Sequence, residues 1–109
     1  MDTLASKPLE FGLSEQILSS LRQVFAQFPQ VDKAVVYGSR ATGAYRSYSD
    51  IDIAVMAPAM TDREFSSLWN ALDDLPILFK LDAVHFERVV NPRLRENILN
   101  EGVDLYPVA

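Results

Sequence analysis

Two aspartates stand one residue apart in the apolar stretch SDIDIAV, where the pattern predicts a strand. Asp50 and Asp52 alternate there with apolar residues, and side chains two positions apart on a strand project from the same face. The two carboxylates should therefore lie side by side and raise each other's pKa unless a cation compensates their charge. A divalent cation with a preference for oxygen ligands is the economical compensation, and it suits a phosphate-bearing substrate.

A third acid stands in apolar company in the stretch FKLDAVHF, at Asp82. If its strand lies beside the strand that carries Asp50 and Asp52, the three carboxylates form one site. Two metal ions held by such a set are a known device for in-line phosphoryl or nucleotidyl transfer. Each feature alone has a plainer reading, since Asp-x-Asp at a strand's start can be a solvated edge or a cap, and a lone strand aspartate is more often structural.

A glycine turn precedes the aspartates, directly after the apolar run KAVVY. Gly38 permits a positive φ and the close approach of a ligand to the backbone. A turn that opens into a short helix exposes backbone amides that favour phosphate. Ser39 adds a hydroxyl, and Arg40 adds a fork that matches phosphate oxygens. Neither the P-loop nor the dinucleotide-binding fingerprint is present, so the turn acquires meaning only together with the aspartates.

The elements that must position these residues follow from hydrophobic periodicity and from capping residues. In chain order we expect a helix over 14–28, strands over 33–38 and 50–57, a helix over 61–75, a strand over 77–86, a helix over 92–102 and a short edge strand over 103–106. This order indicates an α/β fold, with a small mixed β-sheet packed with helices. We expect a single domain over residues 1–109, with residues 1–12 as a flexible N-terminal segment.

Composition narrows the function classes. The chain has 109 residues, a net charge of −5, a hydrophobic content of 49% and no cysteine. The absence of cysteine excludes zinc-thiolate and thiol chemistry, and the acidic balance argues against direct binding of nucleic acid, which depends on neutralising phosphates. The N-terminal residues do not resemble a signal peptide, and no apolar run is long enough to span a bilayer. We therefore expect a cytoplasmic protein without a membrane segment.

The whole construction resembles a known family. The stretch GSRATG followed by SDIDIAV is similar to the signature of the DNA polymerase β superfamily of nucleotidyltransferases, which reads Gly-Ser, ten residues, Asp-x-Asp; here residues 40–49 are the ten. The resemblance extends over most of residues 31–106. The compact size resembles the minimal nucleotidyltransferases, which are encoded beside a helical partner of the HEPN type, often as antitoxin and toxin.

The resemblance implies a role for each residue of the motif. It implies Mg²⁺ as the metal, as a pair of ions, and ATP as the substrate. Asp50 and Asp52 would bind the metal ions. Asp82 would also bind metal and would activate the acceptor hydroxyl. Gly38 and Ser39 would contact the triphosphate, with Arg40 nearby.

On this reading, the chain transfers AMP from ATP to a hydroxyl, a tyrosine on the cognate HEPN-type protein, and so neutralises a toxin. It would form an assembly with itself or with this partner. Two alternatives stay open. One is an antitoxin or scaffold without catalysis that masks its partner by binding. The other is a transferase that acts on a hydroxyl of a small molecule.

Outside the motif, the charged side chains are expected to have ordinary roles. His85 lies three residues after Asp82 and should point to the opposite face of the strand, where we interpret it as structural. Arg93 and Arg95 should lie on a solvated face of the last helix.

Overall fold

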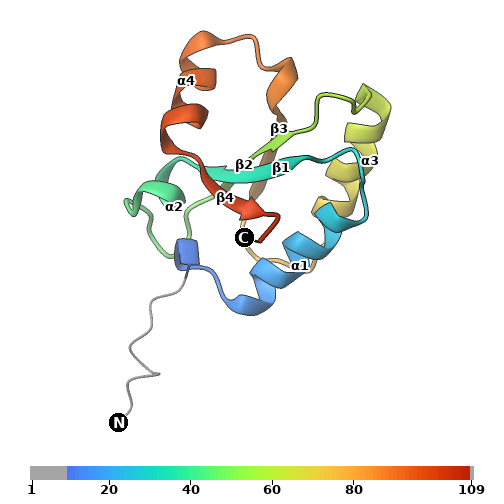
Figure 1. The fold of residues 1–109 in the computed structure, drawn as a ribbon. Coiled ribbons are helices and arrows are strands. Elements are labelled where there is room, and N and C mark those ends of the chain that lie inside the picture. The colour runs from blue at the N-terminus through green and yellow to red at the C-terminus, as the bar shows by residue number, and fades with distance from the viewer. Residues whose placement is uncertain (1–9, 109) are drawn as a thin grey trace.

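The computed structural model describes residues 10–108, and its chain alternates helices and strands around one sheet (Figure 1). The strands are β1 (Lys33–Tyr37), β2 (Ile51–Met56), β3 (Leu81–His85) and β4 (Val103–Tyr106). The helices are α1 (Glu15–Ala26), the one-turn α2 (Ser39–Thr42), α3 (Asp62–Asp73) and α4 (Pro92–Glu101), with short 3-10 helices at Glu10–Gly12 and Phe86–Arg88. Every helix and strand expected from the sequence is present.

The sheet has the strand order β3-β2-β1-β4. β1 pairs antiparallel with both β2 and β4, whereas β2 and β3 run parallel and are connected through α3. The expectation of a small mixed sheet packed with helices is thus confirmed. The parallel pair is the feature that matters for the site, because it places the corresponding residues of β2 and β3 side by side.

The helices begin where polar side chains satisfy their free backbone amides. The Ser14 hydroxyl accepts a hydrogen bond from the Ile17 amide at the start of α1. Thr61 and Glu64 form a reciprocal capping box at the start of α3, with distances of 2.8 and 3.1 Å. Such caps fix where a helix starts and contribute on the order of 1 kcal/mol each.

The third strand is shorter than expected. It begins at Leu81 instead of residue 77, because Ile51, the first residue of β2, pairs with Leu81 and no strand lies beside the residues before it. The segment between α3 and β3 therefore runs as a loop, in which Leu78 is fully exposed.

Helices cover the two faces of the sheet unequally (Figure 1). α1 and α3 lie on one face and bury the main core, which includes Leu18, Phe25, Ile51, Ile53 and Leu68. α4 lies on the other face, where its Ile98 packs with Val35, Tyr37 and Ala54. One helix thus covers the second face, whereas two helices cover the first.

Part of the expected N-terminal segment is outside the described residues. Residues 1–9 of the flexible segment expected over 1–12 are not described, whereas Glu10–Gly12 form a 3-10 helix and Phe11 packs against the main core. Within residues 10–108, no helix combines the length and the apolar character that a membrane crossing requires.

Candidate active site

The parallel register of β2 and β3 brings two of the three aspartates together. Asp52 pairs with Asp82, and neighbours in register project from the same face of a sheet. Asp50 stands just before β2, with Asp52 two positions on; Asp50 and Asp82 are exposed, and Asp52 is half-buried. Burial raises the pKa of the Asp52 carboxyl, the charges of Asp82 and Asp50 raise it further, and Lys80 opposes them.

Tyr37 belongs to this site, although the sequence did not single it out. It is the last residue of β1 and pairs with Asp52 across the antiparallel ladder. Burial and the charges of Asp52 and Asp82 raise the pKa of the Tyr37 phenol to about 12. The phenol therefore stays protonated at neutral pH. Sequence reasoning missed it because the register of β1 against β2, and not any local motif, places it beside the carboxylates.

The glycine turn lies directly against Asp52. Gly38 has a φ of 75°, a conformation that favours glycine. A Cβ atom at this position would lie 2.8 Å from Oδ2 of Asp52. Position 38 therefore requires glycine for two reasons: the positive φ and the short distance to the Asp52 carboxylate. Ser39, the next residue, is half-buried and opens α2.

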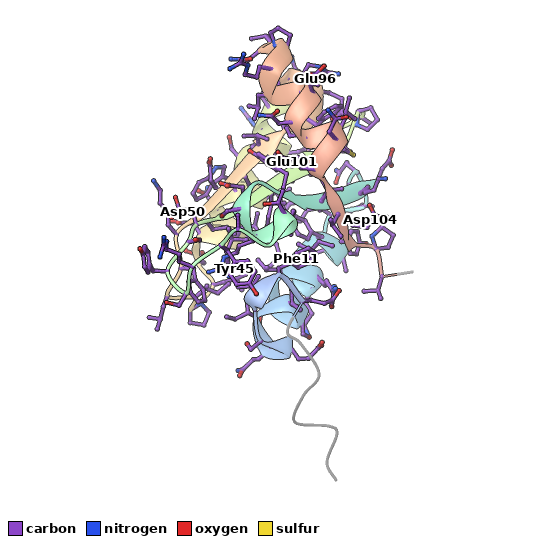
Figure 2. All side chains as sticks on the ribbon, turned by 90° about the vertical axis from the view of Figure 1, so that its left-hand side faces the viewer. Phe11, Tyr45, Asp50, Glu96, Glu101 and Asp104 are labelled. Carbon is purple, nitrogen blue, oxygen red and sulfur yellow. The ribbon has the colours of Figure 1, made fainter. Side chains whose placement is uncertain are left out.

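A fourth carboxylate reaches the same turn from α4. The Gly38 amide donates a hydrogen bond of 3.2 Å to Oε1 of Glu101, the last residue of α4 (Figure 2 labels Glu101 and Asp50). The bond ties the end of α4 to the end of β1. No signal in the sequence indicates this contact, because the two residues are 63 positions apart.

Arg40 has a different environment from the one expected. Arg40 is only 2% exposed. Its guanidinium donates hydrogen bonds to the carbonyl oxygens of Phe11, Ser49 and Ser47, with distances of 2.9, 3.0 and 3.4 Å. It also lies over the rings of Tyr45 and Phe79, at 5.2 and 4.7 Å from their centroids. Figure 2 labels Phe11 and Tyr45, which lie together on this side of the molecule.

The expectation that Arg40 lies near the triphosphate stays a prediction, but its hydrogen bonds give it a structural role as well. A guanidinium that already donates to backbone carbonyls has few N–H groups left for phosphate. Burial lowers the pKa of Arg40 from its ordinary value. The residue acts as an internal brace, which joins the N-terminal 3-10 helix to the loop that leads into β2.

The donor set is suited to a hard divalent cation. Asp50, Asp52 and Asp82 supply only oxygen ligands, and the raised pKa of Asp52 marks a carboxylate whose charge nearby groups do not balance. Within residues 10–108, no three acidic or histidine side chains have already converged into a metal-holding group. The aligned pair of Asp52 and Asp82 is thus the fixed part of the site, and Asp50 is its exposed third member.

Of the three remaining charged candidates, two match their expected roles. His85 is buried on the α3 side of β3, where its Nε2 lies 2.8 Å from the Ala57 carbonyl oxygen and its ring stacks on Phe65. Arg93 is exposed. For Arg95 the expectation of a solvated side chain was wrong. Arg95 is half-buried, and its guanidinium lies over the Phe86 ring, 4.3 Å from the ring centroid.

Replacing the internal brace should destabilise the fold. Arg40→Met removes the donor of three backbone carbonyl groups and a buried guanidinium, so we expect the free energy of unfolding to fall by about 3 kcal/mol. Urea denaturation followed by circular dichroism measures this change. The matched control is Arg46→Met, because Arg46 is exposed in the loop between α2 and β2. Equal effects of the two substitutions would contradict the assigned role of Arg40.

Asp52→Asn should stabilise the protein at neutral pH. The raised pKa means that folded Asp52 binds its proton more tightly than unfolded Asp52, so wild-type stability falls as the pH rises through the interval above 3.8. The asparagine variant lacks this fall. Thermal unfolding across acidic and neutral pH should show a higher Tm for the variant at pH 7 and no advantage at the acidic end. Asp32→Asn, an exposed loop position, should leave the profile unchanged.

Solved structures show the same arrangement of elements. A crystal structure of a toxin–antitoxin with AMP-PNP is 25% identical to this chain, with 88% of this chain and 75% of that one covered and a TM-score of 0.60. A mutant of the toxin–antitoxin MntA-HpeT is 22% identical with the same coverage and a TM-score of 0.57, and shows the shared fold. No match is found among curated proteins.

The family is shown by a match over most of the chain. Residues 19–107 match the family described as Polymerase beta, Nucleotidyltransferase. The matched range includes the glycine turn, all three aspartates and both strands that align Asp52 with Asp82. The chain therefore belongs to the polymerase beta nucleotidyltransferase family.

Proposed function

We propose that this chain is a metal-dependent nucleotidyltransferase that transfers AMP from ATP to a hydroxyl of a partner protein. The observation that carries the proposal is the alignment of Asp52 with Asp82, directly beside the Gly38 turn. Burial and the charges of Asp82 and Asp50 raise the pKa of the Asp52 carboxyl, so its ionised form is unfavourable in the isolated fold. The presence of the carboxylates is explained if a cation and a triphosphate complete the site.

The site residues have separate tasks in this reaction. Asp50, Asp52 and Asp82 would hold two Mg²⁺ ions, which when bound lower the pKa of the acceptor hydroxyl and offset negative charge on the leaving pyrophosphate. Gly38 and Ser39 hold the triphosphate. Asp82 takes the proton of the acceptor hydroxyl.

The transfer exchanges one phosphorus–oxygen bond for another. The acceptor oxygen forms a bond to the α-phosphorus of ATP, while the bond between that phosphorus and the oxygen that bridges to the β-phosphate breaks. Pyrophosphate leaves with the electron pair of the broken bond. The acceptor is left as an AMP ester.

The proposed acceptor is a tyrosine hydroxyl on a HEPN-type toxin encoded beside this chain. The fold shared with a toxin–antitoxin crystal structure that contains AMP-PNP supports a nucleotide substrate and a toxin partner. In this proposal the chain acts as the antitoxin, in the cytoplasm, and modification of the toxin neutralises it.

An antitoxin that works by binding alone is less well supported. Such a protein has no use for aligned carboxylates, and burial together with the charges of Asp82 and Asp50 raises the pKa of Asp52, which makes the charge of Asp52 unfavourable in the folded chain. Substitution by a neutral isostere would relieve that charge while keeping the shape of the surface. The two readings therefore differ in what Asp50→Asn does to protection against the toxin.

Transfer should be visible as a mass increase of the partner. The HEPN-type protein encoded beside this chain is incubated with the chain, ATP and Mg²⁺, and its intact mass is measured. We expect a gain of one AMP residue or a multiple of it. Asp50→Asn and Asp82→Asn should each lower the rate by about a hundredfold or more, because a preorganised charge is removed from the reacting centre. Chelation of Mg²⁺ should stop the reaction.

Asp32→Asn serves as the matched control, since it removes an exposed carboxylate outside the site. Full activity of this variant and loss of activity in the two site variants support the proposal. An unchanged partner mass, with a stable complex of the two proteins, would overturn transfer in favour of binding alone.

A further inference from the structure

One hydrogen-bond donor of the candidate site is already occupied by an acid of the chain itself. The Gly38 amide donates to Oε1 of Glu101 at 3.2 Å, whereas the proposed function assigns this amide to the triphosphate. A carboxylate oxygen and a phosphate oxygen are both anionic acceptors for a backbone N–H. Glu101 therefore stands where the proposed function needs a phosphate oxygen, and the two anions compete for one donor.

The surroundings of Gly38 make this competition exclusive. A Cβ atom added to Gly38 would lie 2.8 Å from Oδ2 of Asp52, so the Asp52 carboxylate occupies the space beside the Gly38 Cα atom. A phosphate oxygen that accepts from the Gly38 amide must approach along the N–H direction, where Oε1 of Glu101 lies. One N–H makes one well-aligned hydrogen bond. The phosphate oxygen therefore has to displace the carboxylate.

Charge and bond length both make Glu101 displaceable. Within residues 10–108, no lysine or arginine forms an ion pair with Glu101. A triphosphate next to this carboxylate is a juxtaposition of like charges, which is unfavourable. The bond of 3.2 Å is at the long end of the range for N–H···O hydrogen bonds. An oxygen that is better placed can therefore replace Oε1.

The backbone at the end of α4 has little freedom to move, so the side chain of Glu101 has to leave by rotation. Gly102 follows Glu101, and a Cβ atom added to Gly102 would lie 2.5 Å from the Ile98 carbonyl oxygen and 3.1 Å from Cγ2 of Val35. Ile98 itself is buried against Val35. The helix end is thus packed closely on β1. Glu101 is half-buried, so its side chain can rotate toward solvent.

We propose that Glu101 sets the affinity of the site for ATP, because its carboxylate takes the Gly38 amide in the unliganded chain and leaves it when the triphosphate binds. The same competition applies to pyrophosphate after transfer, so Glu101 also favours release of this product. The proposal rests on the proposed function for the nucleotide site, but ATP binding can be measured without transfer.

The Gly38 amide gives a direct readout, since the chain has only four glycines. The chain is labelled with ¹⁵N-glycine, ATP with Mg²⁺ is titrated in, and the Gly38 resonance is followed by NMR. We expect a saturable shift in the wild-type chain. In Glu101→Ala the Kd for ATP should be about tenfold lower, because no hydrogen bond to a charged group has to be broken and one negative charge is removed.

Glu101→Gln and Glu96→Gln form a matched pair. Each replaces a carboxylate of α4 by its neutral isostere, but Glu96 is exposed. Glu101→Gln should lower the Kd for ATP by less than Glu101→Ala, because the glutamine oxygen still accepts from the Gly38 amide. Glu96→Gln should leave the Kd unchanged. Since glutamine keeps the hydrogen bond, Glu101→Gln tests the proposal if Glu101→Ala does not fold.

The outcomes separate the role of Glu101 from the reaction. If the Kd falls in the Glu101 variants but no AMP is transferred to the partner protein, the role stands and the proposed reaction fails. If AMP is transferred while the Glu101 variants bind ATP as the wild type does, the role is overturned and the reaction stands. Weaker binding in these variants would also overturn the role. The absence of any shift of Gly38 in every chain would overturn both.

Discussion

Repulsion between Asp52 and Asp82 is the constraint on which the rest of the site depends. The charge of Asp82 adds to burial in raising the pKa of Asp52, and the hydrogen-bonded ladder of β2 and β3 keeps the two residues in register against this cost. That ladder is held in turn by the core beneath it, where Ile51 and Ile53 are fully buried against α1 and α3. The apolar face of β2 thus sustains an unfavourable arrangement of charge on its opposite face, as is common where function and stability compete.

The sequence was sufficient for the elements and for the chemistry of the motif, because both depend on local patterns. The alternation of polar and apolar residues in SDIDIAV and the capping residue Thr61 are signals that span only a few residues. The structure has the strand and the helix that they predict. The start of β3 was misplaced because a strand ends where its neighbour ends, and the extent of β2 cannot be read from the residues of β3.

The rest of the site depends on pairing between distant segments. Tyr37 and Glu101 reach the carboxylates and the turn through sheet register and through the placement of α4, and neither leaves a signal in its own neighbourhood. Arg40 shows the opposite difficulty. Its residue type suggested phosphate binding, but the Arg40 side chain is buried against Tyr45 and Phe79 and donates to backbone carbonyls. An arginine beside a glycine turn has the same sequence appearance whether it faces a ligand or the protein interior.

The brace at Arg40 has a kinetic consequence for the loop between α2 and β2. The guanidinium joins the carbonyl oxygens of Ser47 and Ser49 to its own helix, so the loop is closed into a short ring of contacts instead of a free span. Such a ring leaves few conformations to be searched when substrates arrive. The loop that leads to Asp50 is therefore held in one conformation by these bonds, and we expect turnover not to depend on its opening.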